Sequence, residues 1–287
     1  MTKEEKNKIK SEFLHQVQTF AETLKEYVST PDNQWTIKGF IDVFERIYTI
    51  SNDAKIVSKV LEIQLFAKFL AFSEAYGYNL VLAEKQNWYP DISLVSKTNP
   101  AIKFALDLKT TYRLEGNSDY CNGFTLGSHG MYFIDRTSNK NIQFPYGDYL
   151  GHYCLGIIYS RSAVNTIDET RTFPIENLNV IPSVIQNFTF FVCEKWTIAS
   201  DKGGSGNTAN IGSISNIKDI IAGHGTFKHL GEEWFDDYWM NFGKITIKDG
   251  DEKTKKITSL KDFLTYRGAD ESLVHPKTSK KGGKNGR

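Results

Sequence analysis

The chain has 287 residues, 40% of them hydrophobic, and a formal net charge of +1. This length suits one large domain, or one domain with appended lobes, and supplies enough apolar residues for a core. A charge balance so close to zero excludes a protein that attracts nucleic acid through an overall positive field, so any DNA site must be a local basic cleft.

The cysteines and the apolar segments indicate the cellular compartment of the protein. The three cysteines show no CxxC or Cys/His ligand spacing. This argues against a disulfide framework and structural zinc, and it is typical of a reducing cytoplasm. Residues 1–6 are too charged to open a signal peptide. The most apolar helical stretch, residues 60–72, contains Glu62 and Lys68, so we expect no membrane span.

The first predicted element is an amphipathic helix within residues 1–30. A capping box formed by Thr2 and Glu5 begins it, and Pro31 ends it. Its apolar residues follow helical spacing and are Phe13, Val17, Phe20, Leu24 and Val28. This face can pack either on the body of the protein or on a second subunit.

A second helix is predicted from a cap at Asn52 or Asp53 to about Ala75, after strand character at residues 35–37 and 48–50. We expect its core face to consist of Ile56, Val60, Ile63, Phe66 and Leu70. The other side is also apolar, which predicts a well-buried helix. Glu62, inside this run, is either an exposed helical acid or a third carboxylate that leans into a metal site.

A β-hairpin is predicted next. A strand over residues 79–82 and a polar loop precede it, and its own strands are expected at 92–95 and 103–109. Asp91 and Asp107 each lie eight residues from Asn99, the middle of the intervening turn. Folding at Asn99 therefore places the two carboxylates opposite each other. Like charges so placed destabilise a sheet, unless a cation lies between them.

Strand alternation adds a lysine to this pair. Ala105, Asp107 and Lys109 share one face of the second strand, and the apolar residues share the other. Two carboxylates that hold a hard divalent ion beside a lysine form the apparatus for phosphodiester hydrolysis. Lys109 would bind nonbridging oxygens or help to position and deprotonate the attacking water. In the alternative, both aspartates are surface acids at the rims of the hairpin.

The rest of the chain mixes strands and helices without a βαβ rhythm, which favours an α+β fold with a central mixed sheet flanked by helices. We expect residues 1–267 to form a single domain and residues 268–287 to form a basic, disordered tail. The other expected elements are a polar loop over 113–123, a helix or strand over 146–159, a β-rich run over 187–199, a glycine-rich loop over 203–212, and short helices near 214–223, 231–242 and 258–266.

Polar residues near the hairpin are candidates for contacts with nucleic acid. Gln86 and Asn87 are either plain turn residues or contacts to the minor groove or phosphates. Hydroxyl groups at Thr110 and Thr111 could hold phosphates. The glycine-rich loop is neither a P-loop nor a dinucleotide fingerprint. It is either a flexible linker or a segment whose backbone approaches a groove closely, with the amide of Asn207 suited to pair with adenine.

Several segments together resemble the EcoRV family of type II restriction endonucleases. They occur in the family's order, within about residues 52–267, and are residues 87–91, 105–112, 124–127, Asp201, 204–208, 210–213 and 237–239. Pro-Asp with Asp-x-Lys alone is a loose signature of the PD-(D/E)xK nuclease superfamily. Its combination with Gly-Ser-Gly-Asn-Thr at residues 204–208 is highly specific.

The resemblance implies a restriction-endonuclease-like fold and a homodimeric, Mg²⁺-dependent enzyme that cuts double-stranded DNA at the palindrome GATATC, leaving blunt ends. A cognate DNA methyltransferase is the implied functional partner. Asp91 and Asp107 are the implied metal ligands and Lys109 the catalytic lysine. Glu62 is implied as an acidic residue near the metals, and the backbone carbonyl of Leu108 as a further ligand.

The resemblance also implies a set of DNA contacts, centred on a recognition loop within residues 203–213 that enters the major groove. Gln86 and Asn87 match the family's minor-groove loop. The full implied set is Gly204, Ser205, Gly206, Asn207, Thr208, Gln86, Asn87, Thr110, Thr111, Tyr112 and Thr125.

Departures from the family pattern bear on the DNA target. Ala209 replaces a threonine and residues 128–132 align poorly, and both border the implied DNA site. The sequence therefore predicts the hydrolytic reaction more firmly than the DNA sequence that is cut. Two alternatives stay open: a repair or recombination nuclease on the same scaffold, and a DNA-binding module that does not cleave.

Overall fold

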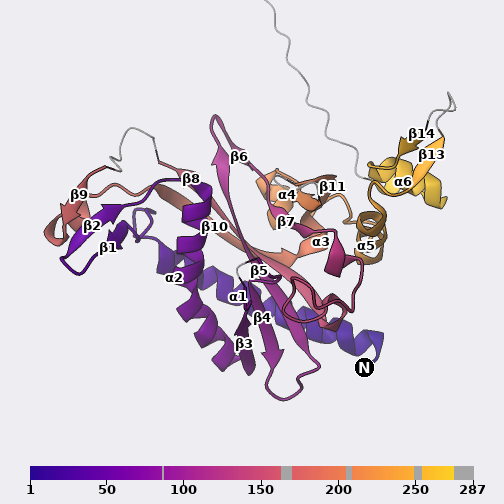
Figure 1. Ribbon diagram of the computed structural model, residues 1–287, viewed down its shortest axis with the longest axis horizontal. Helices are drawn as coiled ribbons and strands as arrows, with labels where there is room; N and C mark the ends of the chain where they lie inside the picture. Colours follow the sequence, from indigo (N-terminus) through magenta and orange to yellow (C-terminus); the bar gives the residue numbers. More distant parts are fainter. Residues whose placement is uncertain (86, 163–169, 205–208, 249–253, 275–287) are drawn as a thin grey trace, which may run out of the picture.

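A computed structural model describes residues 1–85, 87–162, 170–204, 209–248 and 254–274. Its centre is a six-stranded sheet with the path β10-β8-β5-β4-β3, and β6 pairs with the end of β5 (Figure 1). β5 and β8 run parallel, and the other neighbours run antiparallel. The strands are β3 (Tyr78–Leu82), β4 (Ile92–Ser96), β5 (Lys103–Leu114), β6 (Asn117–Cys121), β8 (Gly151–Arg161) and β10 (Ile185–Glu194). The predicted α+β fold with a central mixed sheet is therefore confirmed.

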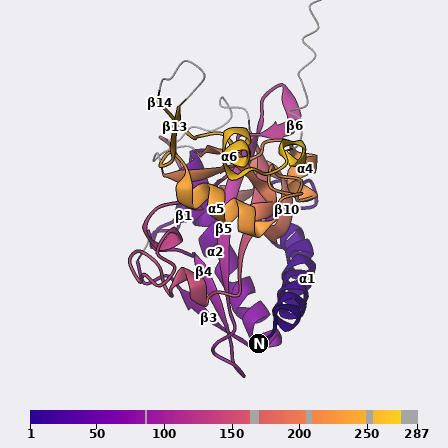
Figure 2. The ribbon, with the colours of Figure 1, turned by 90° about the vertical axis from the view of Figure 1, so that its right-hand side faces the viewer.

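Two long helices, α1 (Lys3–Val28) and α2 (Ala54–Ala75), pack on one face of this sheet. The predicted capping box begins α1, because Thr2 accepts a hydrogen bond from the Glu5 backbone and Glu5 accepts one from the Thr2 backbone. Phe13 of α1 stacks on Phe104 of β5, with ring centroids 3.8 Å apart. The helix therefore packs on the body of the protein, along β10 (Figure 2).

The predicted core face of α2 is wrong in part. Asp53 caps the helix, as expected, but Ile56, Ile63 and Leu70 are exposed. The buried face is instead formed by Val57, Val60, Leu61, Leu65, Phe69 and Phe72. Apolar residues surround most of this helix, so their spacing alone could not choose the face that meets the sheet.

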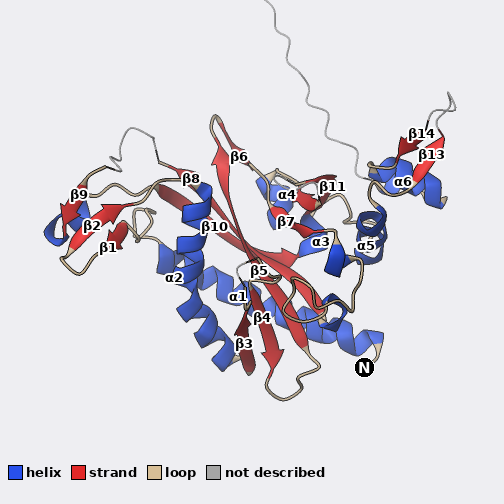
Figure 3. Ribbon diagram, viewed as in Figure 1, coloured by secondary structure: helices blue, strands red, loops and turns tan. Residues whose placement is uncertain are grey.

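Short helices and a small sheet cover the other face (Figure 3). Helices α4 (Ile217–Ile221), α5 (Glu232–Asn241) and α6 (Leu260–Arg267) confirm the three helices predicted there, and α3 (Lys195–Ile198) follows β10 directly. The small sheet has the order β11-β12-β7. Its strands are β7 (Thr125–Ser128), β11 (Ala199–Gly203) and β12 (Asn210–Ser213), and a separate hairpin comprises β13 (Thr246–Lys248) and β14 (Thr254–Lys256).

A small lobe projects beyond the end of the central sheet, at the left of Figure 1. It contains the antiparallel sheet β1-β2-β9 and the 3₁₀ helix η4. Its elements are β1 (Gly39–Ile41), β2 (Arg46–Thr49), β9 (Thr172–Pro174) and η4 (Ile175–Val180). The first strand thus begins later than the predicted residues 35–37, where Trp35 forms an isolated bridge with Ser29 and no strand continues from it.

Three further expectations are resolved or corrected. Residues 113–123 are not a loop: β5 continues to Leu114 and β6 pairs back against it. The ambiguous segment 146–159 is mostly strand β8, after a 3₁₀ turn over Tyr146–Asp148. Residues 269–274, predicted to belong to the disordered tail, are ordered instead, because Ala269 and Val274 pack against the core; residues 275–287 lie outside the described part of the chain. Within that part, no helix is long and apolar enough to cross a membrane.

Candidate active site

The hairpin formed by β4 and β5 places two carboxylates side by side. Its register pairs Ile92 with Leu106, so Asp91 lies opposite Asp107, as the sequence predicted. The Asp91 backbone N–H donates to Oδ1 of Asp107 at 3.3 Å. The Leu108 N–H donates to Oδ2 of Asp91 at 2.8 Å. These two backbone hydrogen bonds hold the carboxylates at the end of the hairpin.

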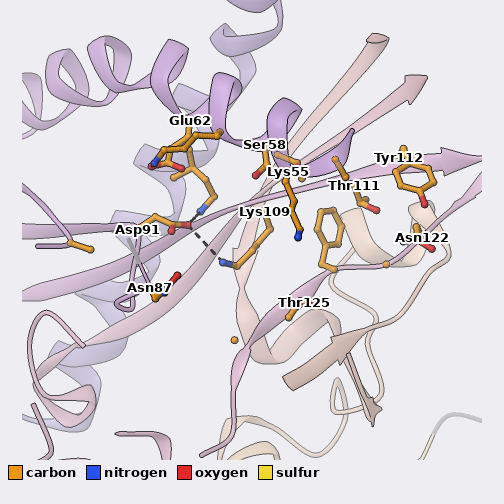
Figure 4. Close-up of a pocket in the computed structure, with 18 of the residues that line it drawn as sticks. Lys55, Ser58, Glu62, Asn87, Asp91, Lys109, Thr111, Tyr112, Asn122 and Thr125 are labelled. Carbon is orange, nitrogen blue, oxygen red and sulfur yellow. Dashed lines mark hydrogen bonds and ion pairs between the residues drawn. The ribbon is translucent and has the colours of Figure 1, made fainter. Parts of the chain in front are cut away.

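Lys109 forms ion pairs with both carboxylates, and Figure 4 shows it beside Asp91. Its Nζ is 3.3 Å from Oδ2 of Asp107 and 3.7 Å from Oδ2 of Asp91. Burial alone would lower the pKa of Lys109, but attraction to Asp107 and Asp91 raises it above its usual value. Lys109 is therefore a cation, and it supplies the positive charge that the sheet needs between two opposed acids.

The two aspartates differ in their surroundings. Burial, together with the charge on Asp107, raises the pKa of Asp91 above its usual value, against the pull of Lys109. Burial also disfavours the charged form of Asp107, but Lys109 and Lys195 overcome it and lower the pKa of that carboxyl. Asp107 is thus the more firmly ionised of the two.

Lys195 was missed by the sequence analysis. It begins α3, its side chain is 7% exposed, and its Nζ is 3.4 Å from Oδ2 of Asp107. Burial lowers the pKa of Lys195, and Asp107 acts in the opposite direction. The available signal was its position two residues after the buried Cys193, which predicts a buried side chain. Nothing in the sequence indicated its partner, because Asp107 is far from it along the chain.

A cleft of about 930 Å³ opens above this pair, between α2, β5 and β7 (Figure 4). Many of the residues predicted to work in a site line it together: Glu62, Asn87, Asp91, Leu108, Lys109, Thr110, Thr111, Tyr112 and Thr125. Asp107 is 2% exposed and lies below the cleft. The structure thus gathers, from four separate stretches of the chain, side chains that the sequence singled out.

The cleft is basic on balance. The sequence analysis missed four residues that line the cleft: Lys55, Ser58, Lys59 and Lys85. The first three lie on one face of α2, and their helical spacing from Glu62 was a usable signal. Four lysines and two acids, the latter being Glu62 and Asp91, line the cleft. This is the local basic cleft that a chain of almost zero net charge requires for binding a polyanion.

Glu62 faces the cleft but is held by a neighbour. Its Oε1 lies 2.7 Å from Nζ of Lys59, one turn earlier on α2. The side chain of Glu62 is 22% exposed and that of Lys59 is 49% exposed, so the pair is of the solvated kind that contributes little to stability. Glu62 is therefore available to other partners at low cost.

The predicted recognition loop is described only at its base. Ser205, Gly206, Asn207, Thr208 and Gln86 lie outside the described residues. The Gly204 N–H donates to the carbonyl of Asn210 at 2.7 Å, next to the paired strands β11 and β12. A Cβ at Gly204 would meet the Ile211 carbonyl oxygen at 3.0 Å, so this position favours glycine.

The donor set at the carboxylates fits a hard divalent ion. In the part of the chain that the structure describes, no group of three or more His, Cys, Asp or Glu side chains gathers as a metal cage. Mg²⁺ does not need one, because it commonly takes one or two carboxylates and completes its shell with water and substrate phosphates. The buried Oδ2 of Asp107 accepts no hydrogen bond among the described residues. Asp91 and Asp107 therefore suit Mg²⁺ better than a structural metal.

Comparisons with known proteins agree with this geometry. A family model described as "Restriction endonuclease EcoRV" matches residues 31–268. The chain is 34% identical over 238 residues to the type II restriction enzyme EcoRV of Escherichia coli, across 83% of this chain and 94% of that protein. The match includes the β4–β5 hairpin, the cleft and the loop between β11 and β12.

Proposed function

Because this chain belongs to the EcoRV family of type II restriction endonucleases, we propose that it hydrolyses duplex DNA at a short palindrome in a Mg²⁺-dependent reaction. Membership makes it a site-specific deoxyribonuclease; the metal, the target and the site residues are the proposal. The observation that carries it is the hairpin register, which opposes Asp91 to Asp107 and places Lys109 between them.

Each residue of the hairpin has a role in this proposal. Asp91, Asp107 and the backbone carbonyl of Leu108 would hold Mg²⁺, which supplies a Lewis acid and a more acidic water when it is bound. Lys109, a cation at the cleft surface, donates to the nonbridging oxygens of the phosphate and positions the attacking water. Glu62, once it leaves Lys59, adds a third carboxylate at the rim.

DNA would lie in the basic cleft. Lysines on α2 and the hydroxyls of Thr110, Thr111 and Thr125 line it at positions suited to phosphates. Tyr112 and Asn87 line the same cleft, with Asn87 at the proposed minor-groove side together with Gln86. The remaining proposed contacts are in the loop Gly204, Ser205, Gly206, Asn207 and Thr208, which would read base edges in the major groove. We propose GATATC as the target, cut at its centre to give blunt ends.

We also propose a homodimer that joins two copies through the small lobe. A palindrome has two identical half-sites, which a two-fold dimer reads with one subunit each. The small lobe exposes apolar residues close together: Phe40 is 52% exposed, Ile41 56%, Val43 90% and Phe44 73%. Apolar patches of this kind mark interaction surfaces, and a second copy of the chain is the partner that the palindrome requires.

A nuclease of this specificity would need protection of the host DNA. We propose that a DNA methyltransferase modifies the same site and that both enzymes act in the cytoplasm, where the three free, buried cysteines stay reduced.

Digestion of a plasmid of known sequence tests the function. The purified protein with Mg²⁺ should give discrete fragments with blunt ends at GATATC, and EDTA should prevent cleavage. Discrete fragments that end at another palindrome would show that the proposed target is wrong and that the proposed reaction is right. A smear would favour a repair or recombination nuclease, and binding without nicking would favour a DNA-binding module.

A further inference from the structure

Lys195 is a buried ammonium beside Asp107, next to the cleft but not exposed to it. Its side chain is 7% exposed, and it is not among the residues that line the cleft. The register of β10 and β8 pairs Cys193 with Cys154, and β8 in turn pairs Cys154 with Asp107. Asp107, Cys154 and Cys193 thus form one row across the sheet, and Lys195, the first residue of α3, lies two residues after the end of that row.

The surroundings of Lys195 hold its ammonium in one place. Nζ is 3.4 Å from Oδ2 of Asp107 and 4.2 Å from the ring centroid of Tyr89. Tyr89 is itself fixed, because its hydroxyl is hydrogen-bonded to Nδ1 of His152 at 2.8 Å. A Cβ at Gly127 would lie 3.1 Å from Nζ, so a glycine there leaves room for the ammonium.

Among the described residues, Asp107 is the only acid that forms an ion pair with Lys195. A buried ammonium costs several kcal/mol unless it is paired, and an apolar side chain of this length would fill the same space without that cost. The charge of Lys195 therefore acts on Asp107.

Oδ2 of Asp107 has two ammonium groups within 3.4 Å, Lys109 on the cleft side and Lys195 on the buried side. If Lys109 turns towards a phosphate, Lys195 is the ammonium group of the protein that still holds Asp107. We propose that Lys195 is a positioning residue: it fixes the Asp107 carboxylate from the buried side, so that Lys109 is free for substrate and Oδ1 keeps the hydrogen bond from the Asp91 backbone N–H. This inference rests on the proposed metal site and extends it.

The test is cation binding to the DNA-free protein, with Ca²⁺ as the probe in titration calorimetry. In Lys195→Met, no group holds the Asp107 carboxylate from the buried side, so its oxygens are no longer fixed where a cation needs them, and this loss must outweigh the repulsion that the ammonium would have exerted on the cation. We expect Ca²⁺ affinity to fall at least about tenfold and turnover with Mg²⁺ to fall with little change in KM for DNA. Lys195→Arg, which keeps the charge, should restore both to within a few-fold.

Two controls separate the possible failures. Lys10→Met removes another ion-paired lysine, bound to Glu194 and Glu232 away from the cleft, and should lower the melting temperature without changing Ca²⁺ affinity. Asp107→Asn should abolish Ca²⁺ binding; if it does not, the metal site itself is wrong.

The proposal is overturned if Lys195→Met binds Ca²⁺ as tightly as the parent or more tightly, since Lys195 would then only repel the cation. Should Lys195→Met fail to melt cooperatively, Lys195→Gln takes its place, because its amide can still donate a hydrogen bond inside the pocket. The same tenfold loss is expected of it, and an unchanged affinity would count equally against the proposal.

Discussion

At the scale of single residues, the site is built around one buried carboxylate that is shared by two cations. Asp107 is 2% exposed and lies within 3.4 Å of the ammonium groups of Lys109 and Lys195. Asp91 is more exposed and faces the cleft. One aspartate is thus fixed by the protein and the other faces the space for substrate, which is a suitable division for two ligands of one ion.

Replacing Asp107 by asparagine tests the proposed role of this carboxylate. We expect cleavage to fall by about 10³-fold or more, because a metal ligand is lost, while DNA binding persists because the cleft lysines are untouched. Rates of plasmid nicking and gel-shift affinity in EDTA measure the two quantities. A melting curve must accompany them, since the change leaves Lys195 unpaired. Cleavage within tenfold of the parent would show that Asp107 is not a metal ligand.

At the scale of elements, the sequence predicts best where contacts are local. The β4–β5 hairpin follows from alternation and a turn at Asn99, and its register is confirmed. The capping box of α1 is likewise a contact between residues three apart.

The sequence predicts poorly where distant segments decide the outcome. The buried face of α2 depends on which side meets the sheet, and α2 is apolar nearly all round. Residues 113–123 form a hairpin although they are polar, because β6 pairs with the end of β5. Lys195 approaches Asp107 only through the sheet, across strands whose pairing the sequence does not show.

The contact between β8 and β10 provides a test of packing. A Cβ added to Gly156 of β8 would lie 2.1 Å from ring atoms of Phe191 in β10. We expect Gly156→Ala to lower the free energy of unfolding by about 1–3 kcal/mol, since overpacking forces side chains and backbone to shift. Urea unfolding measures this as a lower midpoint at constant slope.

Gly203→Ala is a matched control for this substitution. Its new Cβ would meet only the Asn210 carbonyl oxygen, at an ordinary 3.5 Å, so its stability should stay within about 0.5 kcal/mol of the parent. Equal midpoints for the two variants would show that Phe191 moves aside without cost.

The turn between β1 and β2 is held by Asp42, which accepts hydrogen bonds from Phe44, Arg46 and Tyr48. Desolvation would raise the pKa of Asp42, but these hydrogen bonds lower it to about 2. A lowered pKa means that the turn gains stability above the unfolded value of about 3.9 and loses it as pH falls towards 2. An NMR titration of the carboxyl carbon should show this low midpoint, and a midpoint near 3.9 would contradict it.

At the scale of the whole molecule, two cores on opposite faces of one sheet fix the cleft, while the small lobe stands apart from both. Four exposed apolar residues of the lobe lie within five consecutive positions, 40–44. Neither core uses these side chains, which leaves them available for the second copy of the chain that we propose.

A charge placed on the small lobe tests this dimer. Phe44 is 73% exposed on the lobe, and Phe44→Glu would bury an unpaired carboxylate in an apolar interface. We expect the dimer dissociation constant to rise at least about 100-fold, which sedimentation velocity would detect as a shift to monomer at micromolar concentration. Double-strand cleavage should fall with it, because one subunit reads only a half-site.

Ile221→Glu is the control for the lobe substitution, because Ile221 is 49% exposed and is the last residue of α4, a helix that lies far from the lobe in Figure 1. It should leave both the sedimentation coefficient and the cleavage pattern unchanged. A parent protein that sediments as a monomer on its DNA site would contradict the dimer itself. If the Phe44→Glu variant stays dimeric, the interface must lie on another surface, because a carboxylate cannot be buried in an apolar contact without a large loss of affinity.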